Sequence, residues 1–220
     1  MKSLFILFSS FLLLFPGREH NSDRTAWKLK KVKDGITVFT RDLPNTNLKE
    51  LKIDLIMEHA TLSKIITILG DTEAYTKWVY NLLDSKKLHR LNQRESYDYF
   101  ALDFPWPLSN RELYTKSTYS QNRKTKVLTI LTEANLRYAG KANDMVRMTE
   151  HRNKWLLEPI SKDQVRITYF LNSNPSGNIP NWAVNMALDY GPISTMNALR
   201  QRLEHPKYRD FQPLEWIVEY

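Results

Sequence analysis

Two arginines in apolar, strand-like sequence are the residues best suited to polar chemistry inside this protein. Arg111 and Arg147 need partners if they are buried, because an unpaired buried charge is very costly. The available carboxylates are Asp103, Glu112 and Glu133. An arginine–carboxylate pair in a cavity would bind the polar end of an otherwise apolar ligand. Two alternatives stay open: both arginines point to solvent, or Asn110, Arg111 and Glu112 form a structural group at the base of a loop.

Enzymatic chemistry has little support in the sequence. The five histidines lack the spacing of a metal site, and cysteine is absent. No serine-nucleophile motif, phosphate-binding loop or dinucleotide-binding fingerprint occurs. His151, between Glu150 and Arg152, is expected to be exposed. We therefore predict no catalytic residue, metal or cofactor; in an enzyme of the cyclase or hydrolase type, Asp103 or His89 would be the acid or base.

A proline-rich loop is the first candidate for ligand contact. It reads Phe104-Pro105-Trp106-Pro107-Leu108, and its prolines lack the N–H groups that a strand needs. The result is a stiff loop that projects Trp106 and Leu108. We interpret Phe104, Trp106 and Leu108 as ligand-binding residues at the mouth of a cavity, able to enter a bilayer surface. In the alternative, Trp106 packs under the loop.

A long helix near the C-terminus is expected to begin at Pro180, a favourable first-turn residue. Apolar side chains recur there at steps of three or four and form one stripe: Trp182, Met186, Tyr190, Ile193, Met196, Leu199 and Leu203. Four of them are predicted to touch a ligand: Trp182, Met186, Tyr190 and Met196. The alternative is that the stripe is plain core. Gly191-Pro192 is expected to interrupt the helix, either as a hinge or as a kink that fits it to a curved sheet.

The elements that position these residues are mostly strands. Apolar and polar residues alternate over 36–41, 51–57, 82–91, 95–104, 112–120, 126–132, 145–159 and 164–172. Residues 27–33 form a short helix or a first strand, 61–70 a capped helix, and 73–79 a second short helix. Successive hairpins followed by one long helix predict the α+β class, with a curved antiparallel β-sheet wrapped around a C-terminal α-helix.

The composition is that of a globular protein. The chain has 220 residues, 42% of them hydrophobic and 25% charged, with a net charge of +8. Lysine and arginine are scattered without a groove-reading motif, so nucleic-acid binding is not expected, whereas weak attraction to anionic membranes is. We predict a monomer with one domain over residues 23–208 and a C-terminal tail over 209–220.

The N-terminus has the pattern of an export signal. Lys2 precedes an apolar run from Leu4 to Gly17, which has the length of a signal-peptide core and is short for a membrane span. Its cleavage site is weak, so an uncleaved N-terminal anchor is the alternative. Either way, residues 1–17 predict that the domain is exported, to the periplasm or out of the cell.

Four motifs, in order along the chain, resemble the START (steroidogenic-acute-regulatory-related lipid transfer) domain family. They are WKLKKVKDGITVFTR (27–41), FPWPLSNRELYTKSTY (104–119), VRMTEHRNKWLLEPI (146–160) and PSGNIPNWAVN (175–185). The resemblance covers about residues 25–205, which is nearly the whole predicted domain.

This resemblance implies a helix-grip fold that encloses a hydrophobic tunnel of lipid size, with the C-terminal helix and nearby loops as its lid. It also implies non-enzymatic binding, and a role in transfer, of one lipid, sterol or other hydrophobic molecule, with transient contact at a membrane surface. Two other classes stay open. One is a cyclase- or hydrolase-type enzyme on the same fold, and the other is a protein-interaction module without a cavity.

Overall fold

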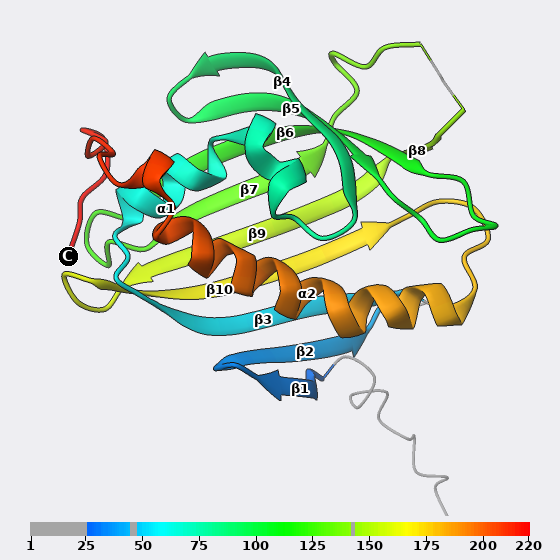
Figure 1. The fold of residues 1–220 in the computed structure, drawn as a ribbon, viewed down its shortest axis with the longest axis horizontal. Helices are drawn as coiled ribbons and strands as arrows, with labels where there is room; N and C mark the ends of the chain where they lie inside the picture. Colours follow the sequence, from blue (N-terminus) through cyan, green and yellow to red (C-terminus); the bar gives the residue numbers. More distant parts are fainter. Residues whose placement is uncertain (1–25, 45–47, 142–143) are drawn as a thin grey trace, which may run out of the picture.

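The computed structural model describes residues 26–44, 48–141 and 144–220. They form a curved sheet with a long helix along one face (Figure 1). The strands are β1 (Lys28–Lys33), β2 (Ile36–Asp42), β3 (Lys49–Glu58), β4 (Leu82–Asn92), β5 (Glu95–Leu102), β6 (Arg111–Gln121), β7 (Leu128–Ala134), β8 (Val146–Met148), β9 (Glu150–Pro159) and β10 (Gln164–Asn174). The helices are α1 (Leu62–Leu69), α2 (Asn181–Leu203) and the 3₁₀ helices η2 (Thr72–Lys77) and η3 (Pro206–Tyr208). The predicted α+β class is confirmed.

The sheet is continuous and open. Its strands follow the order β1-β2-β3-β10-β9-β7-β6-β5-β4, and each neighbour in this order is antiparallel. The short strand β8 lies parallel to β6. The last strand in the sequence, β10, pairs with β3, which is the third. The N-terminal strands β1–β3 are therefore joined to the rest of the sheet through β10. The sheet is therefore one curved surface and is not closed into a barrel.

Alternating side chains give the sheet one apolar face. On β3 the buried residues are Leu51, Ile53, Leu55 and Met57, and each is followed by a more exposed residue. The same alternation buries Ile36 and Val38 on β2 and Val165 and Ile167 on β10. These residues share one hydrophobic core with the C-terminal half of α2. The period of two that predicted the strands thus also decides which face receives the helix.

Helix α1 has the caps predicted for it, and an additional one. The Thr61 hydroxyl accepts a hydrogen bond from Lys64 N at 3.3 Å, and Gly70 follows the last turn. The Glu219 carboxylate accepts hydrogen bonds from Leu62 N at 2.9 Å and from Ser63 N at 2.8 Å. The first N–H groups of a helix have no partner within the helix. Glu219, near the C-terminus, supplies the acceptor for two of those in α1.

Residues 209–220, predicted to be a tail, lie against the sheet and α1. The Gln121 side chain exchanges two hydrogen bonds of 2.8 Å with the Val218 backbone. Ile217 is buried, and the Trp216 ring lies edge-on to Tyr119 at 6.4 Å. This segment therefore adds apolar and polar contacts to the domain at the end of the sheet near α1.

Helix α2 is continuous over 23 residues, with Pro192 inside it. Gly191-Pro192 therefore does not end the helix, and the hinge or kink expected there stays a prediction. A proline removes one backbone N–H, but the φ angle fixed by its ring is the helical value, so the helix continues past it. Ile193, Met196, Leu199 and Leu203 are buried, in agreement with the predicted stripe.

Three predicted elements differ in detail. Residues 27–33, for which a helix or a strand was open, form the strand β1. The predicted helix over 73–79 is the 3₁₀ helix η2. The predicted strand over 145–159 is divided at Thr149 into β8 and β9, because β8 pairs with β6 and β9 pairs with β7 and β10. One uninterrupted strand cannot follow both sets of neighbours.

Candidate functional site

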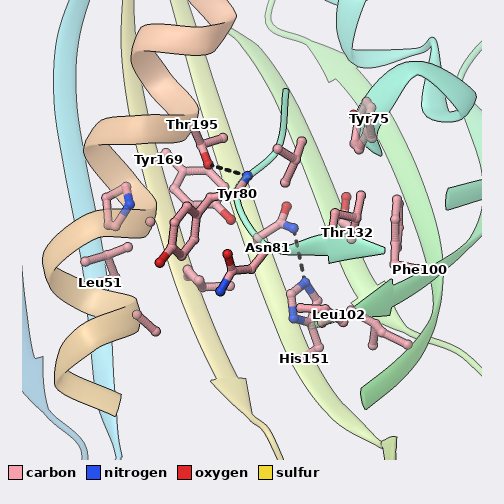
Figure 2. A pocket seen from close by; sticks show the side chains of 18 of the residues that line it. Leu51, Tyr75, Tyr80, Asn81, Phe100, Leu102, Thr132, His151, Tyr169 and Thr195 are labelled. Carbon is pink, nitrogen blue, oxygen red and sulfur yellow. Dashed lines mark hydrogen bonds between the residues drawn. The ribbon is translucent and has the colours of Figure 1, made fainter. Parts of the chain in front are cut away.

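A cavity of about 370 Å³ lies between the sheet and α2. Its walls come from seven strands of the sheet (β3, β4, β5, β6, β7, β9 and β10), from α2, and from the segment that joins η2 to β4. Figure 2 shows side chains of these elements facing a common space, with Tyr169 on one side of it and Phe100 on the other. Small-molecule sites typically have volumes of about 300–1,000 Å³. The alternative of a protein with a filled interior does not agree with this cavity.

Aromatic rings form much of the wall. Trp155 and Tyr169, on neighbouring strands, have ring centres 4.5 Å apart, and Tyr75 stacks on Phe100 at 5.8 Å. Burial raises the pKa of Tyr75 and of Tyr169, and it raises the pKa of Tyr119 to about 12. These three phenols are therefore uncharged at neutral pH. Such a wall favours contact with hydrocarbon.

Small residues of α2 leave room for the cavity. Four of them follow one another at steps of four, and we call them the small-residue row: Ala183, Ala187, Gly191 and Thr195. Residues four apart lie on one helix face, and all four line the cavity. At Gly191 an added Cβ would lie 3.4 Å from a carbon of the Tyr80 ring. Tyr80 N also donates a hydrogen bond to Thr195 Oγ1 at 3.3 Å (Figure 2), which connects α2 to the segment before β4.

His151 is partly buried and lines the cavity, so the expectation that it is exposed is wrong. Side chains alternate along β9, which places His151, Asn153 and Trp155 on the cavity side and their charged neighbours on the other. His151 Nδ1 lies 3.0 Å from Ser173 Oγ, and Nε2 lies 3.2 Å from Asn153 Nδ2. Burial lowers the pKa of His151 to about 4, so the imidazole is neutral at neutral pH.

Further polar side chains of the wall are bonded to one another. The buried Asp98 carboxylate accepts hydrogen bonds from Thr72 Oγ1 at 2.7 Å and from Ser96 Oγ at 2.8 Å. The hydroxyl oxygens of Ser117 and Thr132 lie 2.9 Å apart. The cavity therefore combines an apolar wall with a limited set of hydrogen-bonding groups.

The proline-rich loop borders one end of the cavity. Phe104 and Pro105 line the cavity, whereas the Trp106 side chain is 91% exposed. The alternative in which Trp106 packs under the loop is therefore wrong. Leu108 is partly buried. Trp106 and Leu108 are not among the lining residues in the described part of the chain, so ligand contact at this loop stays a prediction.

Arg111 connects the loop to the turn that precedes α2. It is 3% exposed; its Nε donates to Pro175 O at 3.1 Å, its Nη2 donates to Ser176 O at 3.2 Å, and its Nη1 donates to Ser109 O. The guanidinium also lies 4.2 Å from the centre of the Phe104 ring. Burial lowers the pKa of Arg111. These contacts agree with a structural position at the base of the loop, and the solvent-facing alternative is wrong for this residue.

Arg147 forms the predicted arginine–carboxylate pair. Its Nε lies 2.6 Å from Glu112 Oε1, and the Glu112 side chain is fully buried. The two residues face each other where β8 runs parallel to β6, and Arg147 also donates to the carbonyl oxygens of Gly140 and Lys141. Neither member of the pair is among the cavity-lining residues of the described ranges. The geometry shows that the pair fixes β8 to the sheet.

The predicted stripe on α2 is divided between two environments. Met186 and Met196 line the cavity. Trp182 and Tyr190 are 48% and 61% exposed and do not belong to the lining within the residues described. The small-residue row lies one position further along than Trp182, Met186 and Tyr190. The prediction followed the large side chains and missed this row, although its spacing is visible in the sequence.

Two other candidate residues occupy exposed positions. Asp103 lines the cavity, and His89 lies beside Tyr138, with ring centres 5.3 Å apart. The described residues contain no cluster of three or more His, Asp or Glu side chains suited to a metal ion. Within the same ranges, no helix has the length and apolar character needed to cross a bilayer. The predicted signal segment, residues 1–17, lies outside the described residues.

The fold and the cavity can now be compared with known proteins. A family model of the START domain matches residues 18–209. The chain belongs to the START domain family. This match agrees with the resemblance of the four sequence motifs and extends across all the elements that enclose the cavity.

Relatives of this START domain cover most of its length. A protein of Pseudomonas aeruginosa is 24% identical over 180 residues, which are 81% of this chain and 87% of that protein. The phosphatidylcholine transfer protein of Rattus norvegicus is 24% identical over 75% of this chain and 78% of its own length. The crystal structure of the STAR-related lipid transfer protein from Xanthomonas axonopodis is 29% identical, has a TM-score of 0.74, and covers 81% of this chain and 99% of that one. The predicted helix-grip fold is thereby confirmed, and lipid binding is supported.

Proposed function

We propose that this START domain holds one lipid or other hydrophobic small molecule in its cavity, without altering it chemically, and transfers it between membranes. The observation that carries the proposal is the cavity of about 370 Å³ between the sheet and α2, with its mostly aromatic and aliphatic wall. Two of the similar proteins are named as transfer proteins for lipids.

The wall provides the free energy for binding. Each CH₂ group moved from water into an apolar environment contributes about 0.8 kcal/mol. Neutral phenols and a neutral imidazole add no charge that an acyl chain would have to approach. A hydrocarbon ligand therefore gains affinity along the apolar part of the wall, and the polar side chains of the wall decide the orientation of its polar end.

The proline-rich loop suits contact with a membrane. The exposed Trp106 side chain directly follows Phe104 and Pro105, which line the cavity. Tryptophan favours the interface between lipid head groups and acyl chains. The net charge of +8 adds attraction to anionic lipid surfaces. The proposed transfer step therefore begins with this loop at a bilayer, and the domain acts there as a monomer.

The proposal includes action outside the cytoplasm, on the pattern of residues 1–17. Cell fractionation followed by N-terminal sequencing of the recovered protein tests this part. The expected result is recovery in the periplasm or medium, or in the membrane if the segment is retained as an anchor. Recovery of the full chain in the cytoplasm would contradict export and leave lipid binding untouched.

Two measurements test lipid binding and transfer. Native mass spectrometry of the purified protein is expected to show one additional mass that matches a lipid in a one-to-one complex. A vesicle assay is then expected to show catalysed movement of that lipid from donor to acceptor vesicles. A protein that carries no additional mass and binds no lipid from vesicles would refute the proposal. A ligand recovered in chemically altered form would favour the enzyme alternative.

A further inference from the structure

A polar patch crosses the apolar wall in the middle of the sheet. Ser117 lies opposite Thr132, and Thr132 lies opposite Asn153, on the adjacent strands β6, β7 and β9. All three residues line the cavity. Side chains of directly opposed residues point to the same face, with Cβ atoms about 5 Å apart. One polar group of a ligand can therefore contact two of these side chains at once.

Asn153, on β9, is one of the residues that line the cavity. Its Nδ2 faces His151 Nε2 at 3.2 Å. Its Oδ1 is buried and has no hydrogen-bond partner among the described residues. A buried amide oxygen without a donor is unfavourable, and native proteins rarely leave one in this state. A ligand that suits this position brings a hydrogen-bond donor to Oδ1.

The neighbouring hydroxyl pair supplies a donor. Ser117 Oγ and Thr132 Oγ1 lie 2.9 Å apart, so one hydroxyl donates to the other. The pair has two hydrogens and uses one of them in this bond, which leaves the second for a ligand oxygen. The patch thus combines an acceptor on Asn153 with a donor on the adjacent hydroxyl pair. A ligand hydroxyl group, which donates and accepts, satisfies both.

The charges around the cavity disfavour a phosphate at this position. No lysine or arginine occurs among the described residues that line the cavity. His151 is neutral at neutral pH because burial lowers its pKa to about 4. The buried Asp98 places a carboxylate in the same wall. A phosphate in this patch would be an anion without a cationic partner, which is a very unfavourable arrangement.

We propose that the cavity selects lipids whose polar end is an uncharged hydroxyl group over lipids with a phosphate head group. The hydroxyl donates to Asn153 Oδ1 and accepts from the Ser117–Thr132 pair, while the hydrocarbon fills the apolar remainder of the cavity. This inference rests on the proposed function and specifies its ligand class. It separates this chain from a carrier of phosphatidylcholine.

Four probes with the same acyl chains isolate the contribution of the head group. They are dioleoylglycerol, its methyl ether at the free hydroxyl, dioleoylphosphatidate and dioleoylphosphatidylcholine. Each is used to displace a fluorescent dioleoylglycerol analogue from the delipidated full-length protein. Dioleoylglycerol is expected to bind at least tenfold more tightly than each of the other three. The methyl ether is the strictest comparison, because it keeps the oxygen, stays uncharged and replaces the donor hydrogen with one methyl group.

Two variants assign the preference to the patch. Asn153→Leu removes the acceptor with little change of size and is expected to reduce the preference for dioleoylglycerol over its methyl ether to about twofold. Thr132→Val removes one hydroxyl of the patch. It tests the same preference for dioleoylglycerol over its methyl ether if Asn153→Leu does not fold. Asn172→Leu, at an exposed position on β10, is the matched control and is expected to keep the full preference.

The outcomes separate this inference from the proposed function. If phosphatidate or phosphatidylcholine binds as tightly as dioleoylglycerol, the selection of a hydroxyl head is wrong and lipid binding stands. If both patch variants keep the tenfold preference, the assignment to Asn153 and Thr132 is wrong. If the wild-type protein binds none of the four lipids, the inferred ligand class is wrong, and the native mass spectrometry described above decides the proposed function.

Discussion

The guanidinium of Arg111 lies 4.2 Å from the centre of the Phe104 ring, and this contact joins a buried cation to a residue of the cavity wall. The same guanidinium donates hydrogen bonds to Pro175 O and Ser176 O in the turn before α2. The proline-rich loop and the start of α2 are therefore held together by one side chain. Motion of either segment at the cavity end has to disturb these contacts.

The variant Arg111→Met tests this connection. It keeps an unbranched apolar side chain and removes all the donors, so we expect a loss of about 2 kcal/mol or more in the free energy of unfolding and faster lipid release. Urea unfolding and the dissociation rate of a fluorescent lipid measure the two effects. Arg111→Lys keeps the charge but not the fork of donors. Its stability and its rate of lipid release are expected to lie between those of the wild type and those of Arg111→Met. Unchanged lipid release in Arg111→Met would show that the contact does not control the cavity end.

Trp106 is the side chain whose loss should affect membranes and not folding. Because the ring is 91% exposed, we expect Trp106→Ala to lower vesicle binding and the transfer rate severalfold, with unfolding changed by less than about 0.5 kcal/mol. Vesicle co-sedimentation and the transfer assay provide the measurements. Tyr220→Ala, at a side chain 60% exposed, is the control. Equal vesicle binding by both variants would exclude the loop as the membrane contact.

The small-residue row predicts how ligand affinity depends on volume. Ala187→Leu and Ala183→Leu each add a branched side chain to the cavity and are expected to weaken lipid binding about tenfold. Lipid titration measures the affinity, and circular dichroism verifies the fold. Ser194→Leu makes a comparable change at an exposed position of the same helix and should leave binding unchanged. Full affinity in both alanine variants would mean that the ligand does not occupy the space beside α2.

The buried imidazole of His151 predicts a loss of stability in acid. Its pKa is about 4 in the folded protein against an ordinary value of 6.5, so between these values the unfolded chain binds the proton more strongly. The free energy of unfolding therefore falls as the pH drops from 6.5 to 4, by about 1.4 kcal/mol per pH unit at most, and the contribution is complete above 6.5.

Urea denaturation at several pH values measures this dependence. His151→Gln has no proton to bind and should show a smaller loss between pH 6.5 and 4, whereas His89→Gln, at an exposed position, should behave like the wild type. Parallel curves for His151→Gln and the wild type would rule out His151 as the source of the acid sensitivity.

The last residues of the chain are expected to stabilise α1. Glu219→Ala removes the acceptor of the bonds from Leu62 N and Ser63 N, and we expect it to lower the free energy of unfolding by about 1–2 kcal/mol. Thermal melting and hydrogen exchange of the α1 amides measure the effect. Glu215→Ala, at an exposed carboxylate of the same segment, should have little effect. Identical melting of both variants would show that this cap does not contribute.

Local patterns in the sequence were sufficient for most of the fold. The period of two on β3 indicated both its strand and its buried face, and Thr61 with Gly70 marked the ends of α1. These signals depend on neighbours within a few positions, so one sequence contains them. Contacts between distant segments produce no comparable local pattern in the sequence. The bond from Ser63 N to Glu219 spans 156 positions, and nothing near either residue indicates it.

The site was harder to predict than the fold, for two physical reasons. His151 stands between charged residues, which suggests exposure, although alternation along β9 turns its side chain to the opposite face from theirs. On α2, large apolar residues were the visible signal, but a hollow requires small ones, so the small-residue row went unnoticed. Arg147 was expected to pair with one of three carboxylates inside the cavity, and the structure instead places its pair with Glu112 at β8, away from the lining residues described.

The row of Ala183, Ala187, Gly191 and Thr195 has a consequence for how related START domains diverge. Each position sets part of the length and width of the cavity, and none contributes a side chain to the pairing of strands. Small substitutions along this single helix can therefore change which molecules fit inside, while the sheet that forms the scaffold stays the same.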